Sequence, residues 1–372
     1  MIWHSRRHRG DAVQRQEPDR DLLLIALVRP VELADLTEAE WDALLPRARS
    51  AHLLARLGAE LNACDRTGCL PDRVRNHLAA ATALAARHER VVRWEINRIE
   101  RALRHLDVPI LLLKGAAYVA AGLPTATARL VSDTDIMVPA AALDTVEGAL
   151  ASAGWQPLKL DPYDQRYYRT WMHELPPLRH RERGTVVDLH HTILPRTSRL
   201  KPAPAKLWAA ARRLGDGPLH VLAPVDMVLH AAAHLFHDGD LRRSLRDLVD
   251  IADLLTHFGT IERDFWSALV PRAVALGLER PLFYALRFSR RLLQTPVPGP
   301  VVTAAAKHAP PSVIIEAMDQ LVPRTLVPGS GAAERGAAML LYIRSHWLRM
   351  PPWLLARHLA HQTIARLQYG KR

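Results

Sequence analysis

The fold of this chain is best recognised from residues 132–138, which read Ser-Asp-Thr-Asp-Ile-Met-Val. The residues that follow Asp133 predict a β-strand over residues 134–138, ended by a proline. Side chains two residues apart on a strand point to the same face, so Asp133 and Asp135 project together. Paired carboxylates are typical ligands of Mg²⁺, and substrate phosphates usually complete the coordination shell.

The residues before this acidic pair distinguish it from other acids with the same spacing in the chain. An apolar run at residues 108–113 has the length of a strand, and Lys114 and Gly115 follow it. A helix of small residues is predicted at 116–121. A glycine between a strand and a helix lets backbone N–H groups approach a phosphate near the helix N-terminus. The pattern therefore predicts a phosphate-binding turn ahead of the carboxylates.

A third strand is predicted over residues 185–190, with Asp188 inside it and His190 on the same face. An acid in an otherwise apolar strand needs compensation, because burying a bare charge is costly. A metal ion shared with Asp133 and Asp135 would provide that compensation. In the alternative interpretation the three acids have only a structural role. Asp133 and Asp135 would then be turn residues at a strand end, and Asp188 a salt-bridged carboxylate.

The flanks of this unit have helical periodicity. The predicted organisation is a flexible polar arm at 1–18, a helical segment at 19–105, an α/β core at 106–200 and a helical domain at 201–372. Among the N-terminal helices we predict a capping box at Thr37 and Glu40, and one long helix over 71–105 with Leu84 and Val91 in its apolar stripe. Weaker strands are predicted at 156–160 and 177–181. Breaks between helices are predicted at 296–300 and 323–336.

Four segments of the chain together resemble a large, mostly uncharacterised bacterial nucleotidyltransferase family. They are residues 112–117 (LLKGAA), Arg129, residues 132–138 (SDTDIMV) and residues 187–190 (VDLH). The family belongs to the DNA polymerase beta-type nucleotidyltransferase superfamily, and the helical flanks also fit it. The resemblance implies an α+β fold, in which a small mixed-sheet domain lies between N-terminal helices and a C-terminal helical domain. It also implies transfer of a nucleoside monophosphate from an NTP by two-metal-ion catalysis.

The same resemblance assigns roles to individual residues. Asp133 and Asp135 would bind the metal ion that accompanies the triphosphate. Asp188 would complete a second metal site, and it could act as the base or place a metal-bound hydroxyl for the attacking group. The expected nucleotide-binding residues are Lys114, Gly115, Ala116, Arg129 and Ser132, with His190 as a supporting group behind the metal ligands. Two Mg²⁺ ions are expected, with Mn²⁺ as a possible substitute. The donor would be an NTP, and the acceptor a small molecule, a peptide or protein, or an RNA end.

One departure from the family pattern keeps a second function open. Members of the superfamily commonly have Gly-Ser or Gly-Gly where this chain has Gly115 and Ala116, so a serine contact to phosphate is missing. The chain could therefore be a catalytically silent nucleotide-binding accessory or an antitoxin-like module. Lys114 could instead be a solvated surface lysine, and Arg129 part of an ordinary ion pair at the surface or between domains.

A third function, nucleic-acid binding driven by charge, is suggested by the formal net charge of +12. Only six of the 50 basic residues are lysine, and the arginines are scattered, as GC-rich coding would produce. A dedicated nucleic-acid surface is therefore not favoured. No apolar run reaches the roughly 18 residues of a membrane span, and the first residues do not form a secretory signal. With two cysteines, Cys64 and Cys69, the expected compartment is the cytoplasm.

Two further groups of residues have less specific interpretations. His230, His234 and His237 fall on one face of a predicted helix. They could bind a metal, although lining the face between domains is favoured. The basic tail could lie on an anionic membrane, contact RNA, or form a lid packed on the rest of the protein. Its aromatic and basic residues are Trp347, Trp353, Arg344, Arg349, Arg357 and Arg366.

Overall fold

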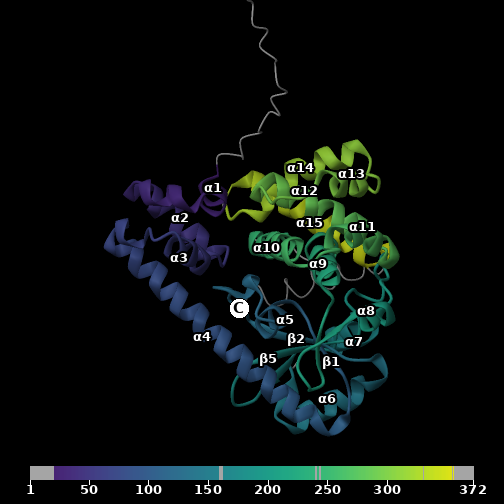
Figure 1. Cartoon of the computed structure of the whole chain (residues 1–372). Coiled ribbons are helices and arrows are strands. Elements are labelled where there is room, and N and C mark those ends of the chain that lie inside the picture. The colour runs from purple at the N-terminus through teal and green to yellow at the C-terminus, as the bar shows by residue number, and fades with distance from the viewer. Residues whose placement is uncertain are drawn as a thin grey trace, which may run out of the picture.

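A computed structural model describes residues 21–158, 162–238, 241–242, 244–329, 331–353 and 355. The predicted arm at residues 1–18, together with Arg357 and Arg366 of the tail, lies outside the described residues. The described part combines one seven-stranded mixed sheet with many helices, which confirms the predicted α+β fold. The helices after residue 224 gather at one end of the molecule, and the longest helix runs diagonally beside the sheet (Figure 1).

The sheet has the strand order β3-β4-β5-β2-β1-β7-β6. Its strands are β1 (Ile110–Leu112), β2 (Asp133–Met137), β3 (Trp155–Pro157), β4 (Leu178–His180), β5 (Val186–His190), β6 (Arg212–Arg213) and β7 (Leu219–Val221). All five strands predicted from the sequence are present; β2 has the predicted length but begins one residue earlier, and the other four are shorter than predicted. The central strand β2 runs parallel to β5 and antiparallel to β1, and Asp135 of β2 lies opposite Asp188 of β5.

The sheet extends past the range expected for the core. β7 pairs in parallel with β1, and β6 pairs with β7, although both follow residue 200. The boundary predicted at residue 200, between the α/β core and the C-terminal helical domain, therefore does not coincide with the end of the sheet. β6 has two residues and β7 has three, and neither lies within a longer apolar run like the one at residues 108–113 that indicated β1.

The helix after β1 starts earlier than predicted. α5 spans Lys114–Ala120, so Gly115 lies in its first turn and not in a turn that precedes it. Lys114, the first residue of α5, has a φ of 43°, in the left-handed region that non-glycine residues seldom adopt. The backbone thus turns sharply between the end of β1 and the helix.

The N-terminal helices are α1 (Leu22–Val28), α2 (Glu38–Ser50), α3 (Leu54–Ala63) and α4 (Asp72–Leu103). The capping box of Thr37 and Glu40 is present at the start of α2. The predicted stripe of α4 is wrong in its middle, where Ala85 and Val92 are buried while Leu84 and Val91 are 46% and 41% exposed. The direction of the buried face depends on what packs beside a helix of this length, which the sequence does not show.

The helices after β7 are α9 (Pro224–Ala233), a π-helical segment (His234–Asp238), α10 (Leu245–Ile261), α11 (Phe265–Leu276), α12 (Glu279–Leu293), α13 (Gly299–Ala306), α14 (Ser312–Leu326) and α15 (Ala332–Arg349). α6 (Leu143–Ser152), α7 (Pro162–Trp171) and α8 (Pro204–Ala210) lie earlier, within the sheet unit. No described helix combines the length and the hydropathy that a bilayer-spanning segment requires.

The break predicted at 323–336 is shorter than expected. Pro323 lies inside the last turn of α14, and α15 has already begun at Ala332. A proline cannot donate to the carbonyl four residues earlier. That carbonyl, of Asp319, instead accepts a hydrogen bond of 3.3 Å from Arg291 of α12. α15 packs on the protein as the predicted lid would, since Arg344 donates to the carbonyl of Phe236 at 2.9 Å.

Candidate active site

Three acidic side chains meet on one face of the sheet. Asp133 and Asp135 lie two residues apart on β2, and Asp188 is the register partner of Asp135 on the parallel strand β5. Residues opposite one another in paired strands share a face, as do residues two apart on one strand. The structure therefore brings together the three acids that the sequence singled out.

Two of the three carboxylates, those of Asp133 and Asp188, are poorly compensated by positive charge. Burial, followed by the charges of Glu174, Asp135 and Asp133, raises the pKa of Asp188 to about 7. Burial and the neighbouring Asp135 also raise the pKa of Asp133. The Oδ1 atom of Asp188 is buried and accepts no hydrogen bond from any residue that the structure describes. An orphaned carboxylate oxygen in a cluster of like charges is the environment that a bound cation would relieve.

Asp135 is the best compensated of the three. Lys114 Nζ lies 2.8 Å from its Oδ1 atom, and His190 Nε2 lies 3.0 Å from the same atom. Burial alone would raise the pKa of Asp135, but these two partners hold it well below the usual range. His190, expected beside Asp188, thus contacts Asp135. Lys114 is not the solvated surface lysine of the alternative interpretation.

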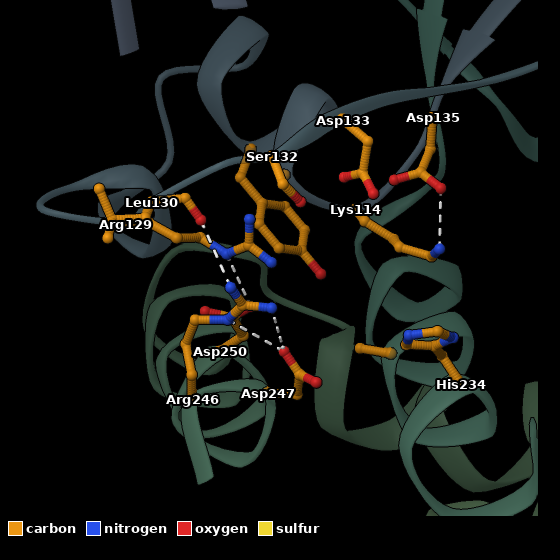
Figure 2. A pocket seen from close by; sticks show the side chains of 13 residues that line it. Lys114, Arg129, Leu130, Ser132, Asp133, Asp135, His234, Arg246, Asp247 and Asp250 are labelled. Carbon is orange, nitrogen blue, oxygen red and sulfur yellow. Dashed lines mark hydrogen bonds and ion pairs between the residues drawn. The ribbon is translucent and has the colours of Figure 1, made fainter. Parts of the chain in front are cut away.

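A cavity of about 110 Å³ opens beside these acids, between the sheet unit and helices α9 and α10 (Figure 2). Sites that bury a drug-sized ligand measure about 300–1,000 Å³. This cavity is smaller, so it has room only for groups of about the size of a phosphate. Its charged and polar lining comes from both sides and includes Lys114, Arg129, Ser132, Asp133, Asp135, Tyr118, His234, Arg246, Asp247 and Asp250. Asp188 and His190 do not line it.

Gly115 lines the cavity, but its lack of a side chain has a local reason. A Cβ atom at this position would overlap Arg129 Nη1 and lie 3.0 Å from both methyl groups of Val131. The glycine therefore makes room for Arg129 in this structure. Ala116 is fully buried in the hydrophobic core and does not line the cavity. Ala116, which stands where the superfamily commonly has serine or glycine, therefore contributes no side chain to the cavity wall.

Arg129 joins the sheet unit to the C-terminal helices. Its Nε atom lies 2.9 Å from Asp250 Oδ2 on α10, and its guanidinium lies 5.6 Å from the ring centroid of Tyr118. Both partners of this ion pair are almost completely buried. The ion pair between domains, named above as the alternative for Arg129, is therefore present. Arg129 still lines the cavity, where Arg246 pairs with Asp247 at 3.0 Å.

Several residues that line or adjoin the site were not singled out from the sequence. Asp247 and Asp250 are three residues apart on α10, a helical spacing that could have indicated a charged face toward the sheet. His173 and Glu174 follow α7 with no local pattern around them. They lie beside His190, with Glu174 Oε2 3.4 Å from His190 Nε2.

The three histidines near α9 do not converge on one metal. His234, the first residue of the π-helical segment, lines the cavity, and burial lowers its pKa to about 4. His230 is buried near Lys114, whereas His237 Nε2 lies 2.7 Å from Ser198 Oγ. The favoured interpretation, a lining of the face between domains, thus describes them better than metal binding. Cys64 and Cys69 are exposed and form no disulfide.

The Arg129–Asp250 pair can be tested through stability. Arg129→Ala leaves Asp250 buried without its partner, so the free energy of unfolding should fall by about 3–5 kcal/mol. Urea denaturation measures this change. As a control, Arg73→Ala removes an exposed ion pair with Asp42 and should cost no more than about 1 kcal/mol. Similar losses in the two variants would contradict the structural role of Arg129.

The charge of Asp188 should make the metal-free protein less stable at alkaline pH. The folded-state pKa of about 7 lies above the unfolded value of 3.8, so stability from the protonated form is present below about pH 4 and lost as the pH rises through 7. Asp188→Asn should therefore raise the unfolding free energy at pH 8, by at most about 4 kcal/mol and by less after solvent screening.

Thermal unfolding in EDTA at pH 8 and pH 5 measures this effect. The gain from Asp188→Asn should be larger at pH 8, while Asp144→Asn, on the exposed side of α6, should change little at either pH. A variant that is less stable than the wild type at pH 8 would show that the carboxylate is compensated within the protein.

Comparison with known proteins agrees with this geometry. A search of curated proteins finds no match, and a search of solved structures finds none either. A family described as uncharacterised nucleotidyltransferase matches residues 37–294, which include the whole sheet, the acidic cluster and helices α2 to α12. The match covers more than half of the chain, and the chain belongs to this uncharacterised nucleotidyltransferase family.

Proposed function

We propose that this protein transfers a nucleoside monophosphate from an NTP to an acceptor hydroxyl in a Mg²⁺-dependent reaction. The observation that carries the proposal is the register of β2 and β5, which sets Asp188 opposite Asp135 beside Lys114 in a nucleotidyltransferase family member. The acceptor would approach between the sheet face and helices α9 and α10, where the cavity opens.

The residues present fit divalent ions. Carboxylate oxygens are the ligands that Mg²⁺ takes from proteins, and the buried, unpartnered Oδ1 of Asp188 is available as one. Asp133, Asp135 and Asp188 would hold the ions, and Mn²⁺ would suit the same oxygen ligands. When bound, such ions neutralise charge on the triphosphate and align the attacking and leaving oxygens.

The side chains of the chain have separate tasks in the transfer. Asp188 accepts the proton of the acceptor hydroxyl as the general base. The acceptor oxygen forms a bond to the α-phosphorus, and the bond from that phosphorus to the bridging oxygen breaks as pyrophosphate leaves. Lys114 lies where it can exchange Asp135 for a phosphate oxygen, with Ser132 beside it in the cavity. Arg129 and Arg246 add positive charge on the opposite side.

The alternative function, nucleotide binding without turnover, is favoured by two observations. The ammonium group of Lys114 already forms an ion pair with Oδ1 of Asp135, where a metal ion would bind. The cavity also measures only about 110 Å³. A protein that kept this arrangement on binding a nucleotide would hold phosphates without assembling the ions. Release of pyrophosphate distinguishes the two functions, because only transfer produces it.

Transfer can be tested with α-labelled NTPs, Mg²⁺ and a cell lysate as the source of acceptor. The wild type should label an acceptor and release pyrophosphate, and Asp135→Asn should reduce both on the order of a hundredfold. Asp144→Asn, an exposed acid on α6, should leave both unchanged. Full activity in a folded Asp135→Asn variant would contradict the proposal. NTP binding without pyrophosphate release in the wild type would favour the silent module.

A further inference from the structure

We propose that His173, Glu174 and His190 form a second kind of metal site, which binds a borderline divalent ion such as Zn²⁺ in preference to Mg²⁺. The site lies behind Asp135, next to the carboxylates assigned above to Mg²⁺. The proposal does not depend on nucleotide transfer, since it concerns metal binding to the free protein.

Backbone pairing holds the three ligands together. Glu174 forms an isolated antiparallel bridge with His190, the last residue of β5. The amide of His191 donates to the carbonyl of His173 at 3.0 Å. The segment that carries His173 and Glu174 is thus fixed along the end of β5, and the meeting of the three side chains is a consequence of the fold.

The two distances from Glu174 to the histidine nitrogens are close to those between ligands of a small ion. In a tetrahedral site with bonds of about 2.1 Å, neighbouring ligand atoms lie about 3.4 Å apart. Glu174 Oε2 lies 3.4 Å from His190 Nε2 and 3.7 Å from His173 Nε2. One ligand atom from each of the three residues lies within 4.8 Å of the other two. Asp135 Oδ1, 3.0 Å from His190 Nε2, is a fourth ligand atom within reach.

The donor set selects the type of metal. Imidazole nitrogens suit Zn²⁺ and other transition metals, whereas Mg²⁺ requires oxygen ligands and keeps several waters. His173 and His190 are 5% and 1% exposed, so their ring nitrogens lie in a site with little solvent. Two imidazoles and one carboxylate, with a further position open to Asp135, form a typical protein zinc site.

An ion at this site replaces a proton. In the metal-free protein His190 Nε2 shares a proton with Asp135 Oδ1 across the 3.0 Å hydrogen bond. A metal ion bound to Nε2 takes the place of that proton, which leaves to solvent. The buried cluster gains positive charge in the exchange, next to the unpartnered Oδ1 of Asp188.

The test is a Zn²⁺ titration of the full-length protein, stripped with EDTA, against a chromophoric chelator and without nucleotide. We expect one tightly bound Zn²⁺ per chain that millimolar Mg²⁺ does not displace. His173→Gln and Glu174→Gln should each weaken binding by more than the roughly 10–100-fold that loss of a second-shell partner costs. His237→Gln, a buried histidine bonded to Ser198, is the matched control and should bind like the wild type.

X-ray absorption of the Zn²⁺-loaded wild type gives a second measurement, which does not require any variant to fold. It should show two imidazole ligands with Zn–N distances of about 2.0–2.1 Å. Fewer than two imidazoles, an absence of bound Zn²⁺, or unchanged affinity in a folded His173→Gln or Glu174→Gln variant would overturn the proposal. Because no NTP is present, a failure here is distinct from a failure of the proposed transfer reaction.

Discussion

The parallel pairing of β2 with β5 is the constraint on which the site depends. It sets Asp188 opposite Asp135, and the alternation of side chains along β2 adds Asp133 to the same face. A register shifted by one residue would turn Asp188 to the other face of the sheet. This arrangement places like charges close together, which contributes to the raised pKa values of Asp188 and Asp133. The surrounding structure supplies cationic partners mainly to Asp135, which leaves Asp188 as the position where a bound ion would gain most.

The helices after β7 complete the site from the other side. Arg129 is anchored by Asp250 of α10, and Gly115 leaves the space that the guanidinium fills. Arg246, Asp247 and His234 then face the acids across the cavity. Breaking the buried Arg129–Asp250 pair would therefore affect both the stability of the protein and the shape of the cavity. A chain cut after β5 would lack β7, the parallel neighbour of β1, as well as this wall of the cavity.

The sequence predicted the parts of the fold that have strong local signals. The five strands up to β5, the capping box at Thr37 and the convergence of the three acids all follow from short patterns. The strands β6 and β7, of two and three residues, were not predicted, because neither lies within a longer apolar run. The buried face of α4 and the helical position of Pro323 depend on partners far away in the chain, such as Arg291 beside Asp319. Glu174 and His173 could not be found because only tertiary pairing brings them to His190. The close approach of Arg129 to Gly115 could not be foreseen, because Arg129 comes 14 residues later in the sequence.

The most direct test of the central claim is a crystal structure of the protein with a non-hydrolysable NTP and Mn²⁺, in which anomalous scattering locates the ions. The account predicts ions bound by carboxylate oxygens of Asp133, Asp135 and Asp188, with the triphosphate beside Lys114. Ions held without Asp188, or a nucleotide bound away from this face of the sheet, would contradict it.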